Sequence, residues 1–245
     1  MGETAAATGV DEAEPSQARP ARPRVIAVDG SAASGKSTIG RRLAAFLGYP
    51  FLDTGIMYRA ITCAALQRNI PLSDDGALSR LASDVTMDVG LPDPGSDGDA
   101  TIEVDGEDVT AKLRSPAVED AVSLVSRVSG VRSALVQKQR DIAARRSIVM
   151  AGRDIGTVVL PHADLKIYLD ASLQERASRR HREFARLGRD VSQEAVLEDI
   201  RRRDQIDSER AVSPLRPADD AVIIGTDGLS LDQVMERVLA LLEAG

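Results

Sequence analysis

The stretch VIAVDGSAASGKST, residues 25–38, decides the fold class of this chain. It begins with an apolar run typical of a buried β-strand, and residues 30–37 (GSAASGKS) match the pattern G-x-x-x-x-G-K-S/T. A helical pattern of apolar residues follows over 36–47. A strand, a loop of small residues and a helix in this order predict a phosphate-binding loop, because backbone N–H groups and the positive end of a helix can surround phosphate oxygens.

The residue types in this loop predict what each part of it binds. Lys36 is expected to reach the β- and γ-phosphates of a nucleotide, and the Ser37 hydroxyl is expected to ligate Mg²⁺ together with water. Contacts with ATP or GTP are expected along the whole loop, from Gly30, Ser31, Ala32, Ala33, Ser34, Gly35, Lys36, Ser37 and Thr38. A glycine turn with a solvated lysine is the alternative, and it does not explain the flanking strand and helix.

The loop alone leaves open whether the nucleotide serves hydrolysis, signalling or group transfer. Guanine-nucleotide switch proteins usually read the base with an Asn-Lys-x-Asp motif. The single asparagine of this chain, Asn69, is followed by Ile70, so the sequence lacks that motif. This argues against the switch-protein class.

The rest of the chain has the pattern of an α/β protein. Short apolar segments predict strands at 51–53, 147–151, 165–170 and 221–225, and amphipathic segments predict helices at 57–68, 131–145, 172–187, 193–205 and 230–243. Buried strands that alternate with helices predict a parallel sheet covered on both faces. Residues 90–113 interrupt this pattern, because Asp105-Gly106 between alternating residues predicts a tight hairpin. Such a β-containing insertion is typical of a lid or a substrate-side region.

Composition limits the class of protein further. The chain has 245 residues, a net charge of −7, one cysteine and two histidines, so it can bury a core without disulfides, and a Cys/His metal site is not expected. Cys63 is expected to be a small buried residue. No apolar run has membrane-spanning length and no secretory pattern is present, so we expect a cytoplasmic protein without membrane contact. The acidic charge argues against a nucleic-acid partner. Residues 1–22 are expected to form a disordered tail.

Arginine is concentrated in one part of the chain. Of the 31 basic residues 27 are arginine, and residues 176–210 contain ten arginines and no lysine. Two arginine-bearing helices on either side of RLGRD (186–190), a natural turn, predict a hinged flap that closes over phosphates, neutralising their charge and excluding water. A solvated helical face is the alternative, and we expect it to account for some of these arginines.

Three further segments follow the phosphate loop: FLDTGIMYRA (51–60), AGRDIGTVVLPHADLKIYLDAS (151–172) and RRRDQIDSERAVSPL (201–215). In this order they resemble the bacterial cytidylate kinases, a family of nucleoside monophosphate (NMP) kinases, over residues 25–243. The resemblance implies phosphoryl transfer from ATP to CMP or dCMP with Mg²⁺, in a protein that is expected to be monomeric with small nucleotides as its partners.

The resemblance also implies an architecture. It is a P-loop NTPase fold with a five-stranded parallel sheet flanked by helices, a β-containing NMP-binding insertion and a short arginine-rich helical lid. We expect a single kinase domain over 23–245. Its core would comprise 23–60, 131–175 and 211–245, its NMP-binding region 61–130 and its lid 176–210.

Individual residues receive roles from the same resemblance. On the acceptor's phosphate side it places Thr54, Tyr58, Arg59 and Arg153. Near the cytosine edge it places Ser123, Arg132 and Asp154, and near the sugar Arg203 and Asp207. The catalytic contacts with the transferring phosphate would come from Lys36, Arg153, Arg180 and Arg210.

The base-reading residues make chemical sense for cytosine. Asp154 and Ser123 can accept from its amino group, and Arg132 can donate to its ring nitrogen and carbonyl. Uracil replaces the amino donor with a carbonyl, which leaves an unpaired buried polar group at a cost of about 1–3 kcal/mol. Taken singly, each residue could have a structural role without base recognition. Asp154 could cap a turn, Arg132 could lie on the surface, and Ser123 could be an ordinary residue in the middle of a helix.

Two positions depart from the family's pattern. Ala151 stands where an acidic residue is common, so Mg²⁺ would rely on Ser37, Asp29 and water, with weaker binding or slower turnover. Ala33 replaces a frequent glycine, which is tolerable if its φ stays negative. Two alternatives stay open: a P-loop kinase for another small acceptor (UMP, AMP or shikimate), and a nucleotide-binding protein without transferase activity.

Overall fold

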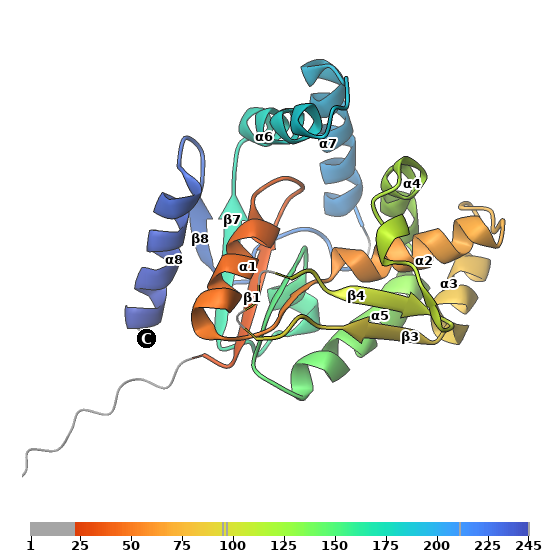
Figure 1. Cartoon of the computed structure of the whole chain (residues 1–245), viewed down its shortest axis with the longest axis horizontal. Coiled ribbons are helices and arrows are strands. Elements are labelled where there is room, and N and C mark those ends of the chain that lie inside the picture. Colours follow the sequence, from red (N-terminus) through yellow and green to blue (C-terminus); the bar gives the residue numbers. More distant parts are fainter. Residues whose placement is uncertain (1–22, 95, 97, 211, 245) are drawn as a thin grey trace, which may run out of the picture.

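The computed structural model describes residues 23–244 except 95, 97 and 211, so the expected tail over residues 1–22 lies outside the described residues. Its centre is a five-stranded parallel sheet in the order β2-β6-β1-β7-β8 (Figure 1). The strands are β1 (Val25–Gly30), β2 (Phe51–Asp53), β6 (Ile148–Gly152), β7 (Leu165–Asp170) and β8 (Val222–Gly225). The predicted α/β fold with a parallel sheet is confirmed.

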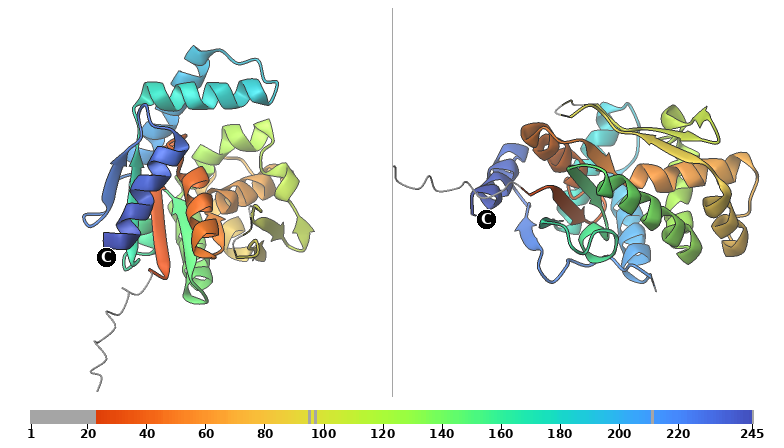
Figure 2. Two further views of the ribbon diagram at one scale, coloured as in Figure 1. Left: turned by 60° about the vertical axis from the view of Figure 1, so that its left-hand side comes forward. Right: turned by 90° about the horizontal axis from the view of Figure 1, so that it is seen from below.

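The sheet separates two apolar cores, because successive strand residues point to opposite faces. Ile26 and Val28 of β1 belong to the core beneath α1 (Lys36–Leu47) and α8 (Leu231–Ala244), which lie side by side in Figures 1 and 2. Ala27 belongs to the core on the other face. That core includes residues of α2 (Gly55–Gln67), α3 (Asp75–Asp84), α4 (Pro116–Ser126) and α5 (Ser129–Ala144).

The segment between α3 and α4 contains a small antiparallel sheet of β3 (Met87–Gly90), β4 (Thr101–Val104) and β5 (Glu107–Asp108), followed by the short η1 (Thr110–Lys112). The predicted hairpin joins β4 to β5, and its turn residues Asp105 and Gly106 have φ of 51° and 82°. Positive φ at both positions is the geometry for which Asp-Gly is favoured. Buried Ile102 and Val104 attach this sheet to the core that contains α2.

The arginine-bearing helices lie together over the carboxyl end of the sheet, at the top of Figure 1. They are α6 (Leu173–Arg186) and α7 (Gln193–Ser208), and α6 follows β7 almost directly. A small apolar cluster built on Ala177, Val196 and Ile200 holds them to each other. Ser172 and Ser192 cap them, each accepting a backbone N–H with its side chain.

Most predicted elements agree with the structure to within two or three residues, and α1, β2 and β7 have the predicted bounds. The sequence reasoning missed α3, α4, β3, η1 and η2 (Ile155–Val159), of which η2 is a π-helical segment. Cys63 is buried, as predicted. No helix within the described part of the chain is long and apolar enough to cross a bilayer.

Candidate functional site

The phosphate loop connects β1 to α1 as predicted. Gly30 cannot be replaced without a clash, because a Cβ there would lie 2.5 Å from the Leu169 carbonyl oxygen. Gly35, with φ of 95°, immediately precedes α1. Lys36 is the first residue of α1, and its ammonium donates to the Ser31 carbonyl at 3.0 Å. Burial, and then the charge of Arg153, lowers the pKa of Lys36 to about 7. Because a phosphate would favour the charged form of this amine, the position suits an anionic ligand.

Ala33 does not keep the negative φ that was expected of it. Its φ is 59°, in the left-handed region where a side chain costs about 1–2 kcal/mol relative to the right-handed form. Ala33 packs against the small apolar cluster of Ala177, Val196 and Ile200 on α6 and α7. The loop residue at this position therefore contacts the helices that lie over it.

A carboxylate that the sequence reasoning overlooked lies beside Ser37. The Ser37 hydroxyl donates to Asp53 Oδ2 at 2.5 Å, and the Gly55 N–H donates to Asp53 Oδ1 at 3.0 Å. Burial alone would raise the pKa of Asp53, but Lys36, the Ser37 hydroxyl and the Gly55 N–H outweigh it and hold that pKa below its ordinary value. Asp53 is therefore ionised beside the serine that was predicted to ligate Mg²⁺.

Asp53 also lies next to Ala151 in the sheet. Asp53 in β2 and Ala151 in β6 are Cα partners on neighbouring strands, so their side chains share one face of the sheet. An acid missing at 151 is thus present one strand away. Asp29, which was expected to help with Mg²⁺, is engaged elsewhere, because its two oxygens accept the backbone N–H groups of Ile155 and Gly156 at 2.8 and 2.7 Å.

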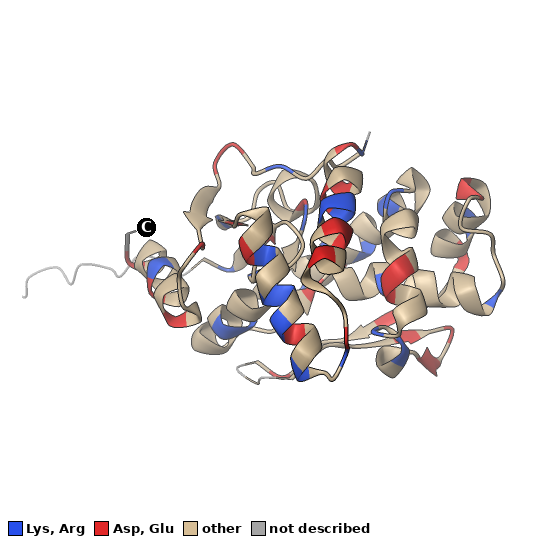
Figure 3. Ribbon diagram, turned by 90° about the horizontal axis from the view of Figure 1, so that it is seen from above, with Lys and Arg blue, Asp and Glu red and all other residues tan. Residues whose placement is uncertain are grey.

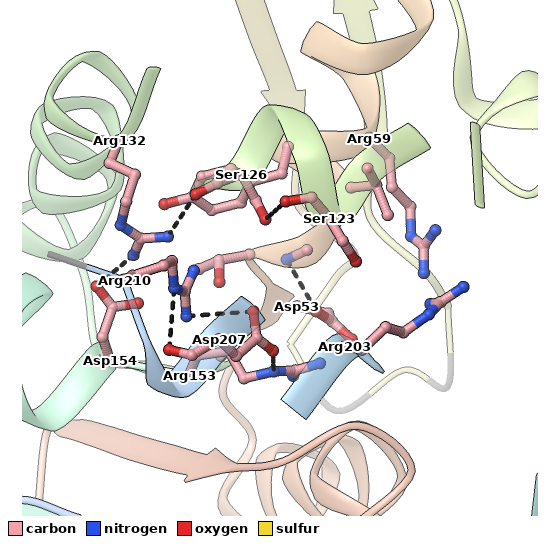
Figure 4. A pocket seen from close by; sticks show the side chains of 15 residues that line it. Asp53, Arg59, Ser123, Ser126, Arg132, Arg153, Asp154, Arg203, Asp207 and Arg210 are labelled. Carbon is pink, nitrogen blue, oxygen red and sulfur yellow. Dashed lines mark hydrogen bonds and ion pairs between the residues drawn. The ribbon is translucent and has the colours of Figure 1, made fainter. Parts of the chain in front are cut away.

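A pocket opens next to the phosphate loop, between the sheet, α2, α4 and α7 (Figure 4). All nine residues assigned to the acceptor line it: Thr54, Tyr58, Arg59, Ser123, Arg132, Arg153, Asp154, Arg203 and Asp207. Arg210 and Asp53 line it as well. These residues come from sequence positions more than 150 apart and are brought together by the fold.

One end of the pocket is formed by Arg132 and Asp154, at the left of Figure 4. Arg132 Nη2 donates to Asp154 Oδ2 at 2.5 Å, and the two side chains are 2% and 5% exposed. Arg132 Nη1 also donates to the Ser126 carbonyl at 3.2 Å, and its guanidinium lies over the Tyr58 ring. A buried pair held by further contacts of this kind keeps both side chains in fixed orientations.

The middle of the pocket contains a carboxylate between two arginines. Asp207 Oδ2 accepts from Arg153 Nε at 2.8 Å, and Asp207 Oδ1 lies 3.4 Å from Arg210 Nη2. Burial would raise the pKa of Asp207, but Arg153 and Arg210 outweigh it and lower that pKa. Asp207 is therefore an anionic hydrogen-bond acceptor inside the pocket.

Two donors in the pocket have no partner among the residues that the structure describes. They are Arg59 Nη1 and Arg132 Nε, both buried. Burial raises the pKa of Tyr58 to about 12, so its hydroxyl stays protonated and able to donate. Buried donors without partners are costly, and five arginines against three aspartates leave the lining positive. The pocket therefore suits an anionic ligand with several acceptors.

Arg180 is the one predicted catalytic arginine that is not in the pocket lining. It lies on α6, where it pairs with Glu183 at 2.9 Å and with Glu119 of α4 at 3.3 Å. Other arginines of α6 hold the phosphate loop: Arg176 donates to the Ala32 carbonyl at 3.2 Å and Arg179 to the Ser34 carbonyl at 3.4 Å. These contacts were not predicted.

The solvated-face alternative holds for part of the arginine set. Arg201 and Arg202 pair with Glu198 and Asp199 three residues earlier on α7, and all four side chains are substantially exposed. Figure 3 shows blue and red segments interspersed along α6 and α7. Such exposed pairs contribute little to stability.

The family model and the curated relatives identify one family. A family model described as cytidylate kinase matches residues 26–244. A cytidylate kinase of Nocardia farcinica is 50% identical over 217 residues, covering 88% of this chain and 92% of the relative. One of Bacillus licheniformis is 43% identical over 218 residues, covering 89% and 95%. A solved shikimate kinase from Acinetobacter baumannii, in complex with shikimate, has a TM-score of 0.44 and 19% identity over 94% of this chain and 98% of that chain. Family membership rests on the sequence matches alone.

Proposed function

The chain belongs to the cytidylate kinase family, which phosphorylates CMP and dCMP with ATP, and we propose that the pocket of Figure 4 holds the acceptor nucleotide. The observation that supports this proposal is that buried donors without a partner among the described residues lie in the same pocket as the Arg132–Asp154 pair. ATP would lie on the phosphate loop, with Lys36 at its β- and γ-phosphates.

Asp154 and Arg132 are proposed to read the cytosine base. Asp154 uses only Oδ2 in its bond to Arg132, so Oδ1 can accept from the cytosine amino group. Arg132 Nε, buried and without a partner among the described residues, can donate to the ring nitrogen or carbonyl. Ser123 lines the same pocket and offers a second acceptor for the amino group. Uracil would present a carbonyl to Asp154, which is repulsive.

The sugar and phosphate of the acceptor would occupy the rest of the pocket. Asp207 is an ionised acceptor for sugar hydroxyls, and Arg203 lies beside it. The phosphate would take the Arg59 Nη1 donor, which has no partner among the described residues, with Thr54, Tyr58 and Arg153 also in the pocket lining. In Figure 4 the Arg59 and Arg203 guanidinium groups lie at the end away from Arg132 and Asp154.

The reaction needs no general base, because the nucleophile is an anionic phosphate oxygen of CMP. That oxygen forms a bond to the γ-phosphorus of ATP, and the bond from this phosphorus to the β–γ bridging oxygen breaks to release ADP. The chain contributes alignment and charge stabilisation. Lys36, Arg153 and Arg210 are proposed to neutralise the transferring group, and Arg180 would join them from the lid.

Mg²⁺ is proposed to bind at Ser37 and Asp53. The residues fit this ion, because a hydroxyl and an ionised carboxylate are oxygen donors that share one hydrogen bond of 2.5 Å. The described part of the chain has no cluster of three or more acidic, histidine or cysteine side chains placed for a metal. Phosphate oxygens and water would therefore complete the shell, where the ion neutralises phosphate charge.

An acceptor panel tests the proposed function. The purified full chain is given ATP with CMP, dCMP, UMP, AMP or shikimate, and ADP release is followed in a coupled assay. We expect the highest kcat/KM with CMP or dCMP. A higher value with AMP or shikimate would contradict the cytosine assignment. Binding of ATP and CMP without turnover would instead indicate a nucleotide-binding protein that has lost transferase activity.

A further inference from the structure

Glu119 of α4 connects the acceptor side of the pocket to the lid. Its Oε1 lies 3.3 Å from Arg180 Nη2 on α6, and its Oε2 accepts from Arg189 Nη1 at 3.0 Å, in the turn between α6 and α7. Its backbone carbonyl accepts from Arg203 Nη2 of α7 at 3.1 Å. One residue therefore makes contacts to α6, to the following turn and to α7.

These ion pairs are less exposed than the Arg201–Glu198 pair of α7. The Glu119 side chain is 12% exposed, whereas the Arg201–Glu198 pair has exposures of 57% and 70%. The Phe184 ring holds both partner arginines in place, since the guanidinium carbons of Arg180 and Arg189 lie 4.5 and 5.5 Å from its centre. A partly buried pair with preset side chains loses less entropy and is screened less by salt than an exposed one.

The charge of Glu119 is maintained by the arginines around it. Burial raises its pKa, but Arg180, Arg189 and Arg59 outweigh burial and hold that pKa below the ordinary value. Arg59 belongs to the acceptor pocket, so the carboxylate stands between the lid arginines and the arginine proposed to bind the acceptor's phosphate. Nothing in the family's pattern described above gives this residue a role.

The position of Glu119 matters because the acceptor pocket has two walls on separate elements. Ser123 and Ser126 of α4 form part of one wall, and Arg203 and Asp207 of α7 form part of the other. Glu119 lies one helical turn before Ser123 and contacts the lid directly. The ion pairs of Glu119 with Arg180 and Arg189 cross between these elements and hold the two walls at one separation.

We propose that Glu119 is a positioning residue that fastens the lid to α4 in the nucleotide-free protein and so preorganises the acceptor pocket. This proposal about Glu119 rests on the proposed function only because it names CMP as the ligand of the pocket. When both nucleotides are bound, their phosphates contact the lid arginines and hold the lid in place. The clasp formed by Glu119, Arg180 and Arg189 then adds little to the attachment of the lid to α4. Loss of Glu119 is therefore expected to weaken acceptor binding and to leave the rate of the ternary complex nearly unchanged.

Glu183 provides a matched control for the test. It also pairs with Arg180, at 2.9 Å, but it lies on α6 itself and cannot tie the lid to α4. Glu119→Gln and Glu183→Gln each remove one carboxylate partner of the same arginine without changing side-chain size. Arg189→Gln removes the Glu119–Arg189 ion pair, the shorter of the two that Glu119 makes, by changing its lid partner. Its effect is therefore expected to match that of Glu119→Gln.

Pulsed electron paramagnetic resonance measures the clasp directly. Spin labels are placed on the exposed positions Asp84 of α3 and Glu194 of α7, as Asp84→Cys and Glu194→Cys in a Cys63→Ala background. Without nucleotide, we expect Glu119→Gln and Arg189→Gln to shift the distance distribution to longer values, and Glu183→Gln to match the unsubstituted protein. The double variant Glu119→Gln/Arg189→Gln is expected to be no more open than either single variant.

Kinetics provide the second readout, in the unlabelled full chain. We expect Glu119→Gln to raise the KM for CMP by about three- to tenfold, with kcat within about twofold of the unsubstituted protein. An unchanged distance distribution in Glu119→Gln would overturn the proposal, as would equal effects of Glu119→Gln and Glu183→Gln, or a fall in kcat at constant KM. If the protein does not phosphorylate CMP at all, the proposed function fails, while the distance measurement still decides the clasp.

Discussion

The Ser37 hydroxyl donates a 2.5 Å hydrogen bond to the Asp53 carboxylate, which lies directly across from Ala151 on the neighbouring strand. This relationship places an ionised oxygen ligand next to the end of the phosphate loop. It also supplies a carboxylate on the face of the sheet from which Ala151 removes one. We infer that Mg²⁺ binding in this chain depends on Asp53.

Asp53→Asn tests this inference. The amide keeps the size of the side chain but loses the charge, so we expect the Mg²⁺ concentration for half-maximal rate to rise by about 10–100-fold. Binding of Mn²⁺ in the presence of ATP, followed by electron paramagnetic resonance, should weaken in parallel. An unchanged metal dependence would remove Asp53 from the site.

Ala151→Asp is the complementary variant. Ala151 is fully buried in the core beneath α1, and an acid there would face Asp53 across the strand pair. We expect no gain in Mg²⁺ affinity and a lower melting temperature, because a second buried carboxylate would repel the first. Tighter Mg²⁺ binding in this variant would mean that Asp53 does not replace the missing acid.

Lys36→Ala should abolish phosphoryl transfer while the fold survives. Lys36 is buried at the start of α1 and is the only lysine of the loop. Loss of its charge is expected to lower kcat by at least about 10²–10³-fold. Circular dichroism and thermal unfolding check the fold, and Lys112→Ala, at an exposed lysine, is the control. Activity within about tenfold of the unsubstituted protein would contradict the role of Lys36.

Asp154→Ala should erode the discrimination between cytosine and uracil acceptors. Removal of the carboxylate leaves no group to reject the uracil carbonyl, so the ratio of kcat/KM for CMP over UMP is expected to fall by about 5–150-fold, which corresponds to about 1–3 kcal/mol. Asp141→Ala, at an exposed aspartate of α5, is the control. An unchanged ratio in Asp154→Ala would mean that the base is read elsewhere.

Asp29→Asn should change how stability depends on pH. Burial raises the pKa of Asp29 from 3.8 to about 6, despite two backbone hydrogen bonds. A group whose pKa is higher in the folded than in the unfolded state contributes stability that is fully present below its unfolded-state pKa. This contribution is lost as pH rises through its folded-state pKa. Between about pH 4.5 and about pH 7, the free energy of unfolding of the unsubstituted protein should therefore fall by about 2 kcal/mol relative to Asp29→Asn. The prediction is contradicted if urea denaturation gives free energies of unfolding that change equally with pH in the unsubstituted protein and in Asp29→Asn.

Local patterns in the sequence predicted the elements around the phosphate loop well. The loop, α1, β2 and β7 depend on residues that are adjacent in the chain, so their spacing was sufficient. The helices α3 and α4 were missed although both carry start signals: Asp74 caps α3 by accepting the Ala77 N–H, and Pro116 is the first residue of α4. Turn residues nearby obscured these signals.

The parts of the site that the sequence did not predict depend on contacts between distant segments. Asp53 lies next to Ser37 only because β2 and β1 belong to the same sheet with β6 between them. Glu119 meets Arg189 across 70 positions of the chain. The positive φ of Ala33 is set by the loop and its packing against the lid, which an alanine in a sequence does not reveal.

A crystal structure with CMP bound tests the central claim most directly. The account predicts the base between Arg132 and Asp154, the sugar near Asp207 and the phosphate at Arg59. Density for CMP at any other place on the molecule, with this pocket empty, would contradict the account.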